Sequence, residues 1–146
     1  VHAALAYGAP RVCFQRGDFL DSAVQRDGGA PVEVPATDLR SLLQRFRIRR
    51  CTLVCDIEGA EVELVRHEAD VLADAVATLV LEVHPWVRGR AAIAAVFAAL
   101  AKRGFVPVFR DQATWVLQNE ALVAVAAADR IPDYTAAAAP VANASA

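Results

Sequence analysis

Two short apolar segments, each running into acidic residues, constrain the fold of this chain more than any other feature. Residues 51–54 are uniformly apolar or small and lead into Asp56. Residues 76–83 are apolar apart from Thr78 and Glu82 and lead into His84-Pro85. Neither segment alternates polar and apolar side chains, which is typical of strands covered on both faces in parallel sheets. A helical pattern over residues 60–72 separates them, with Val62, Val65, Ala69 and Leu72 as its apolar stripe. The order predicts a βαβ unit in an α/β fold.

The rest of the chain extends this pattern on both sides. Residues 1–35 hold short extended pieces that predict a small antiparallel excursion beside the main sheet. Further helices are expected from an N-cap at Thr37 through Phe46 and over residues 90–103, and right-handed crossovers would place the helices on both faces of the sheet. Residues 105–109 and 114–118 are too closely linked for anything but an antiparallel hairpin. We expect one domain over residues 1–119 and an Ala-rich tail over 120–146, with a short helix at 121–129.

Composition limits the class of protein. The chain has 146 residues and a net charge of −2 with no basic stripe, so nucleic acid and anionic membranes are not expected as partners. No apolar run approaches the roughly 20 residues of a membrane span. Three cysteines, an odd number, favour a reducing, cytoplasmic setting over a disulfide framework. Because the chain holds no Met, we expect it to begin inside a longer protein.

Acidic groups are expected to gather where the two parallel strands end. Open α/β sheets bind ligands beyond the carboxyl ends of their strands, so Asp56, Glu58, Glu82 and His84 should lie together. A salt bridge would explain any one of these carboxylates without a functional role. Two neighbouring strands that both end in acidic residues favour a reaction site instead. His84 is the most natural base, because histidine titrates near neutral pH. Asp56 or Glu82 could serve instead, or could orient His84 or hold a divalent cation.

The motif resembles that of a known enzyme family. Asp56-Ile57-Glu58-Gly59-Ala60-Glu61 followed by Glu82-Val83-His84 is similar to the paired motifs of the FkbM family of S-adenosylmethionine-dependent methyltransferases. The run from Val34-Pro35 to Leu39 and the pair Gly104-Phe105 also match the family pattern. The resemblance covers about residues 1–118 and implies a partial Rossmann-like methyltransferase sheet that transfers a methyl group to a hydroxyl of a sugar or small metabolite.

The resemblance also implies roles for particular residues. His84, Asp56 and Glu82 would be catalytic. Asp56 and Glu58 would face the cofactor S-adenosylmethionine, and Glu58, Glu61 and Trp86 would contact the acceptor. Glu61 also suits the first turn of a helix, where it favours the helix dipole. No metal ligand is assigned, and Cys51 and Cys55 are expected to be small buried residues.

One part of the family pattern is missing from the sequence. No Gly-x-Gly occurs, so the Gly-rich turn that grips the cofactor is absent. We therefore expect the strand ending at Asp56 to be an unpaired edge, prone to aggregation or to self-association, and S-adenosylmethionine to bind weakly or not at all. The alternatives are a non-catalytic, degenerate Rossmann-like module that acts as a binding domain, and a metal-dependent hydrolase, against which the lack of a His cluster counts.

Overall fold

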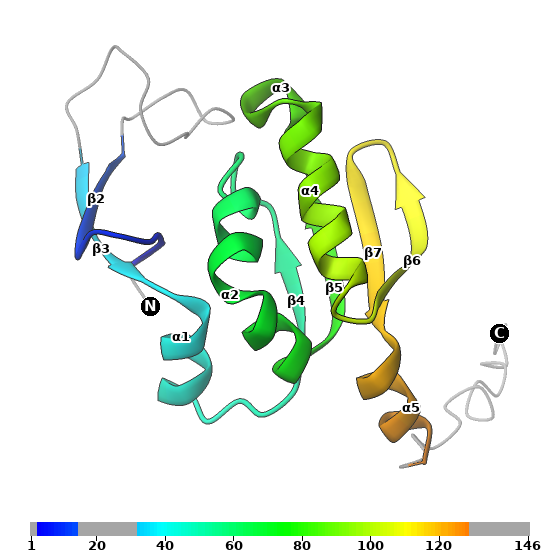
Figure 1. The fold of residues 1–146 in the computed structure, drawn as a ribbon. Coiled ribbons are helices and arrows are strands. Elements are labelled where there is room, and N and C mark those ends of the chain that lie inside the picture. Colours follow the sequence, from blue (N-terminus) through cyan, green and yellow to red (C-terminus); the bar gives the residue numbers. More distant parts are fainter. Residues whose placement is uncertain (1–2, 15–31, 129–146) are drawn as a thin grey trace, which may run out of the picture.

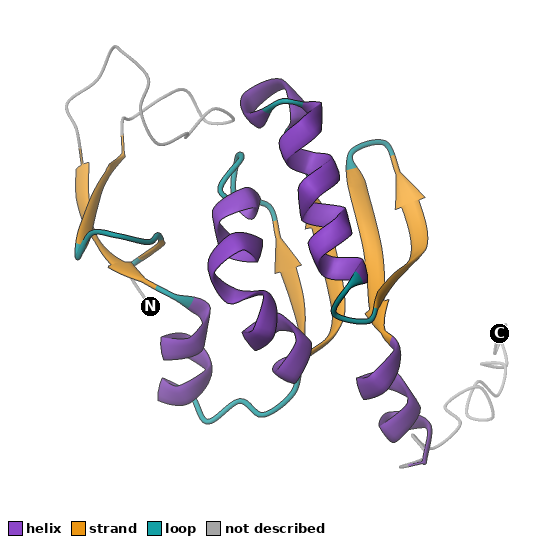
Figure 2. Cartoon of the chain, in the orientation of Figure 1, coloured by secondary structure: helices purple, strands orange, loops and turns teal. Residues whose placement is uncertain are grey.

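A computed structural model describes residues 3–14 and 32–128 of the chain, and these residues form two sheets with helices (Figures 1 and 2). The larger sheet has the strand order β4-β5-β7-β6. Strands β4 and β5 run parallel, whereas β7 lies antiparallel to both β5 and β6. The fold is therefore α/β with a mixed sheet, and the predicted parallel pair and C-terminal hairpin are confirmed. The four strands are Cys51–Cys55 (β4), Val76–Glu82 (β5), Phe105–Asp111 (β6) and Thr114–Asn119 (β7).

The N-terminal part forms a separate sheet of three short strands in the order β1-β3-β2. Strands β2 and β3 pair antiparallel, as expected of an excursion, but β1 pairs with β3 in parallel. Figure 1 shows this sheet to one side of the larger one, next to α1. Its strands are Ala4–Leu5 (β1), Arg11–Phe14 (β2) and Val32–Thr37 (β3).

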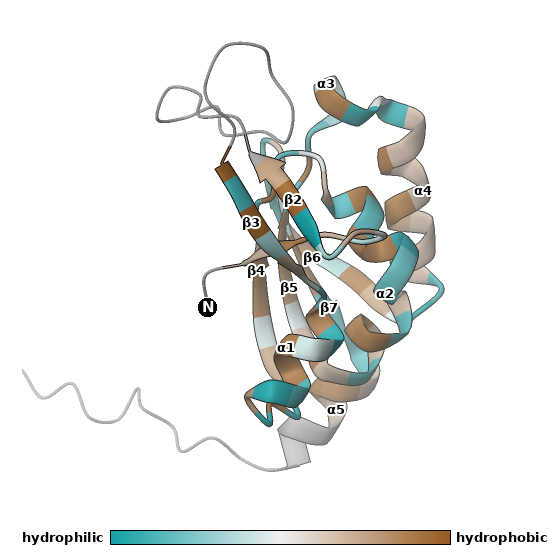
Figure 3. Ribbon diagram, turned by 90° about the vertical axis from the view of Figure 1, so that its left-hand side faces the viewer, coloured by the Kyte–Doolittle hydropathy of each residue, from teal (hydrophilic) through white to brown (hydrophobic). Residues whose placement is uncertain are grey.

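The two long helices pack against each other on one face of the larger sheet, as Figure 3 shows. The expectation of helices on both faces is wrong for the residues that the structure describes. The physical reason lies in the two parallel strands. In β4 and β5 the more buried side chains, such as Cys55, Leu79 and Leu81, alternate with more exposed ones, such as Val54. The helices are Leu39–Arg45 (α1), Glu61–Ala75 (α2), Pro85–Arg88 (α3), Arg90–Ala101 (α4) and Glu120–Ala128 (α5).

Several predicted boundaries need correction. Thr37 is the last residue of β3, and the N-cap of α1 is Asp38, whose side chain accepts a hydrogen bond from the backbone N–H of Ser41. The short helix α3 was not predicted, and it begins at Pro85, a residue that fits the first turn of a helix. The short C-terminal helix is confirmed as α5, and residues 129–146 lie outside the described part.

The predicted apolar stripe of helix α2 is confirmed, because Val65 and Leu72 are buried and Val62 and Ala69 pack partly buried against the core. The helix buries a wider face than predicted. Its buried side chains include Leu64, Val65 and Leu72 and also two carboxylates, Glu61 and Glu68. These positions follow the helical repeat i, i+3, i+4, i+7. The core is completed by residues of β5, α4 and the hairpin: Val76, Leu79, Leu81, Ile93, Val96, Leu100, Phe105 and Leu117.

Strand β4 is an edge of the larger sheet, because among the described residues it pairs only with β5. The expectation that it is unpaired on one side is confirmed, but the expectation of cover on both faces is wrong: Val54 is 72% exposed. The other edge, β6, carries Pro107 and an irregular register after it. Both features interrupt further strand pairing. Strand β4 has no proline, and its register irregularity falls at its start, between Cys51 and Thr52.

No helix within residues 3–14 and 32–128 is long and apolar enough to cross a membrane.

Candidate functional site

The site lies at the carboxyl ends of β4 and β5, where the parallel register brings polar residues side by side. Cys55 pairs with Leu81, so the next residue of each strand, Asp56 and Glu82, emerges at the same end of the sheet. Ligand atoms of Asp56, Glu82 and His84 all lie within 4.8 Å of one another. The predicted convergence of these residues is confirmed.

His84 is held by the start of helix α3. It is the N-cap residue of that helix, and its carbonyl oxygen accepts hydrogen bonds from the backbone N–H groups of Val87 and Arg88. Pro85 follows at the first helical position, where its fixed φ suits the helix and no N–H is required. The chain therefore leaves β5 and turns at once, and His84 as a whole is only 2% exposed.

A buried carboxylate fixes the orientation of the His84 ring. The Nδ1 atom of His84 lies 2.6 Å from Oε1 of Glu61, the first residue of α2, and Glu61 is fully buried. The same Oε1 accepts a hydrogen bond from the backbone N–H of Gly59. The other oxygen of Glu61, Oε2, is buried and has no hydrogen-bond partner in the described structure. A buried carboxylate so placed needs its partners, and the imidazole is the main one.

The turn between β4 and α2 places Glu61 against the His84 ring. Glu58 and Gly59 both adopt positive φ angles, +52° and +98°. A Cβ atom at Gly59 would lie 2.8 Å from Cγ1 of Val87, so this position combines a conformation that glycine favours with a close approach of α3. The Nε atom of Arg88 donates a hydrogen bond of 2.8 Å to the carbonyl oxygen of Gly59. This turn and helix α3 are therefore locked together.

The other ring nitrogen of His84 faces the exposed carboxylates. Nε2 lies 3.6 Å from Oδ1 of Asp56 and 3.5 Å from Oε2 of Glu58. When Glu61 is ionised, Nδ1 carries the ring proton and donates a hydrogen bond to the carboxylate, which leaves the lone pair of Nε2 free in the neutral ring. The arrangement can take a proton at Nε2 and stabilise the resulting imidazolium from both sides of the ring.

Trp86 lies beside His84. Its ring meets that of His84 edge to face, with centroids 5.2 Å apart, and it is 68% exposed. An exposed aromatic ring beside carboxylates offers a surface on which a ligand can stack. Its assignment to ligand binding remains a prediction.

Glu61 is the site residue that the sequence analysis placed least well. It was expected to favour the helix dipole or to contact the acceptor, whereas the structure buries it against His84. A signal was present: Glu61, Leu64, Val65 and Glu68 fall at i, i+3, i+4 and i+7. A carboxylate in step with an apolar stripe faces the core and needs a buried partner.

The cysteines of β4 take no part in this chemistry. Cys51 and Cys55 are both free, and Cys55 is buried. Burial, with a smaller effect of the Glu61 and Asp56 carboxylates, raises the pKa of Cys55 from 9.0 to about 12. The thiol is thus protonated and a poor nucleophile or metal ligand at neutral pH.

The exposed residues of the site are carboxylates, which suit a cationic ligand. The side chains of Asp56 and Glu58 are 56% and 38% exposed, and carboxylates favour a cationic sulfonium nearby. The same end of the sheet has the donor set for a divalent cation in Asp56, Glu82 and His84. A Gly-rich turn that would hold the rest of the cofactor is absent from the sequence.

Comparisons with protein-family models, with curated proteins and with solved structures find no match to this chain.

Proposed function

We propose that this chain carries the acceptor side of an O-methyltransferase site in a partial Rossmann-like sheet of the FkbM type. The observation that carries the proposal is the pairing of buried His84 with buried Glu61, which presents Nε2 to the carboxylates at the strand ends. The resemblance of Asp56-Ile57-Glu58-Gly59-Ala60-Glu61 and Glu82-Val83-His84 to the family motifs supplies the reaction class.

Methyl transfer requires two contributions from the protein, alignment of the acceptor and removal of its proton. S-adenosylmethionine, when bound, supplies a methyl group that is already activated by the sulfonium. The protein must place a hydroxyl oxygen in line with that methyl group and remove the hydroxyl proton. Alignment supplies up to roughly 7–11 kcal/mol in ideal cases, and a positioned base adds a factor of about 10²–10⁴.

In this proposal His84 is the base. Nε2 accepts the proton of the acceptor hydroxyl, while Nδ1–H stays hydrogen-bonded to Glu61. Glu61 is a positioning residue: it fixes the tautomer and stabilises the positive charge that the ring gains. Asp56 and Glu58, close to Nε2, accept hydrogen bonds from neighbouring hydroxyls of the acceptor and face the sulfonium.

The test uses the protein expressed from its complete open reading frame, with radiolabelled S-adenosylmethionine and a panel of sugars and small hydroxylated metabolites. Replacing His84, the base, by Ala should lower turnover about 10²–10⁴-fold, and it should also lower stability because the buried Glu61 loses its main partner. Asp56→Asn changes an exposed side chain, so it should lower turnover while circular dichroism stays unchanged. Full activity in both variants would remove the site assignment. Absence of methyl transfer to every acceptor would favour a non-catalytic binding module.

A further inference from the structure

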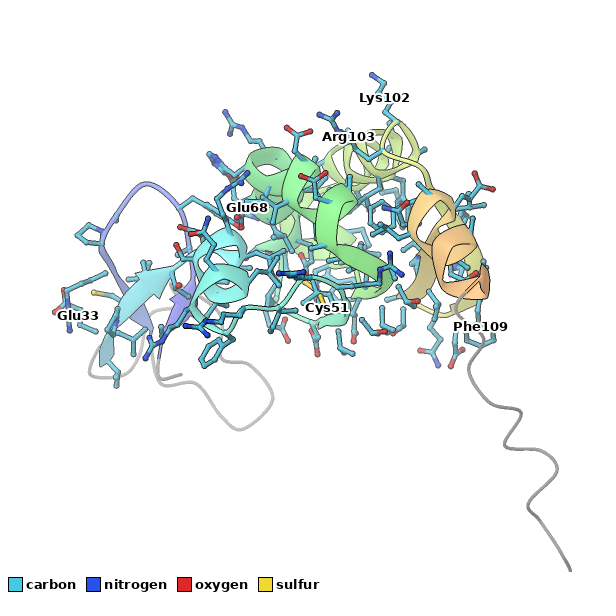
Figure 4. The ribbon with its side chains drawn as sticks, turned by 90° about the horizontal axis from the view of Figure 1, so that it is seen from below. Glu33, Cys51, Glu68, Lys102, Arg103 and Phe109 are labelled. Atoms are coloured by element: carbon cyan, nitrogen blue, oxygen red, sulfur yellow. The ribbon has the colours of Figure 1, made fainter. Side chains whose placement is uncertain are left out.

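We propose a second binding site at the opposite end of the sheet: a pocket between α1 and α2 that takes a small phosphate ester with an apolar group. The pocket has a volume of about 420 Å³, which lies within the range of small-molecule sites. Figure 4 views the molecule from this end, with Cys51, the first residue of β4, directly after the segment that forms one wall.

Three arginines of one short segment line the pocket. They are Arg40 of α1 and Arg47 and Arg49 of the connection to β4, and all three are exposed. Among the described residues, none of the three forms an ion pair. Arginine offers planar, bidentate donors that match phosphate oxygens. Three such groups around one hollow, with only Asp74 as a lining carboxylate, favour a ligand with two negative charges.

The floor of the pocket is apolar. Leu43 and Val71 are buried there, and Ile48 lies beside them. A floor of this kind contributes to binding only when the ligand brings apolar surface of its own. The concave shape and the apolar floor favour a small phosphate ester over the backbone of a nucleic acid, which would need an extended basic surface.

The backbone of Arg47 gives an independent reason to expect a ligand. The last turn of α1 closes with hydrogen bonds from Arg47 N–H to the Gln44 carbonyl and from Ile48 N–H to the Leu43 carbonyl. This is the Schellman pattern, whose left-handed position is usually glycine. Arg47 occupies it with a φ of +54°, a conformation that costs a non-glycine residue free energy. Strained residues of this kind gather at functional sites.

If the arginines serve only the fold, replacing Arg47 should lower the melting temperature. Basic side chains near helix C-termini favour the helix dipole, and on that account Arg47 stabilises the fold. In our proposal Arg47 is present because it binds the ligand, and its positive φ lowers the stability of the fold. Replacing Arg47 by Gly should therefore raise the melting temperature and weaken ligand binding.

The experiment titrates phenyl phosphate and inorganic phosphate into the 146-residue chain and follows binding by calorimetry. We expect phenyl phosphate to bind more tightly than phosphate. We expect R47G to weaken phenyl phosphate binding by about tenfold or more, D74N to strengthen it, and R45Q, whose residue does not line the pocket, to leave it unchanged.

Three results would overturn the proposal. The first is no binding of phenyl phosphate at millimolar concentration. The second is an R47G variant that binds as the unchanged protein does, or that melts at a lower temperature. The third is a single-stranded oligonucleotide that binds far more tightly than phenyl phosphate and with an affinity that grows with its length, which would assign the arginines to nucleic acid.

Discussion

Nδ1 of His84 and Oε1 of Glu61 lie 2.6 Å apart, and both side chains are almost completely removed from solvent. The two residues are 23 positions apart and come from the starts of two helices, α3 and α2. Because Glu61 holds one ring nitrogen, the other is directed toward Asp56 and Glu58. The proposed chemistry depends on this division of the ring into a fixed side and a reactive side.

The turn that positions Glu61 should not tolerate a side chain at Gly59. Gly59→Ala places a Cβ atom at a φ of +98° and 2.8 Å from Val87 Cγ1. We expect a loss of about 1–2 kcal/mol from the backbone and a further ~1–3 kcal/mol from the overlap, measured by urea unfolding.

Gly8→Ala is the control for that variant. Gly8 also has a positive φ, +84°, but no atom lies within 4 Å of its added Cβ. It should show the backbone cost alone. Equal losses in the two variants would mean that the close approach of α3 to the turn does not exist.

A second buried carboxylate, Glu68, should be a strong determinant of stability. It accepts hydrogen bonds from the backbone N–H groups of Leu39, at 2.7 Å, and Arg40, at 2.8 Å, and from the Tyr7 hydroxyl. Figure 4 shows it where α2 meets α1. Glu68→Gln turns an amide N–H₂ toward these donors, so we expect the free energy of unfolding to fall by about 2–4 kcal/mol.

Glu63→Gln on the same helix serves as the control for Glu68. Glu63 is partly exposed and forms ion pairs with the exposed Arg66 and His67, so its replacement should change stability by less than about 0.5 kcal/mol. If Glu68→Gln behaves like Glu63→Gln in denaturant titrations, Glu68 does not anchor the N-terminal part to the sheet.

Because the pKa of Cys55 is raised, the free energy of unfolding should fall in alkali. This pKa is about 12 in the folded chain against 9.0 for an ordinary thiol, so the folded state holds the proton more tightly than the unfolded state. This contribution is complete below pH 9 and is lost as the pH rises from 9 to 12, with a slope approaching roughly 1.4 kcal/mol per pH unit. In Cys55→Ala the unfolding free energy should fall less steeply over this window, whereas replacing the exposed Cys13 should have no such effect. Identical slopes in all three proteins would contradict the assignment.

The free edge of β4 should govern self-association. Val54 is 72% exposed on this edge, and Val54→Lys places a charge there that opposes strand pairing. Sedimentation velocity should show less association in Val54→Lys than in the unchanged chain. Val108→Lys on β6, an edge already interrupted near Pro107, should have a smaller effect. An unchanged chain that stays monomeric at every accessible concentration would show that the edge does not pair.

The sequence was sufficient for local and adjacent features of the fold. Residues 51–54 and 76–83 were predicted as parallel neighbours because a βαβ pattern leaves few other topologies, and the register then brings Asp56 and Glu82 together. The four-residue link before Thr114 likewise required an antiparallel hairpin.

Features set by tertiary packing could not be predicted in the same way. Apolar runs in β4 and β5 suggested cover on both faces, yet the helices lie on one face, because a continuous apolar run does not say which side is covered. The pairing of Glu61 with His84 depends on where α3 begins, and the Asp38 cap depends on where β3 ends. Only the helical spacing of Glu61 and Glu68 carried a signal for their burial.

The position of the proton on the neutral His84 ring decides whether Nε2 can accept a proton. Two-dimensional ¹H–¹⁵N correlation spectra of the ring nitrogens distinguish the two neutral tautomers of a histidine. We predict that neutral His84 carries its proton on Nδ1, and that Glu61→Gln, with Glu63→Gln as control, weakens this preference. A neutral His84 that carries its proton on Nε2 would leave no lone pair directed at the carboxylates and would contradict the account.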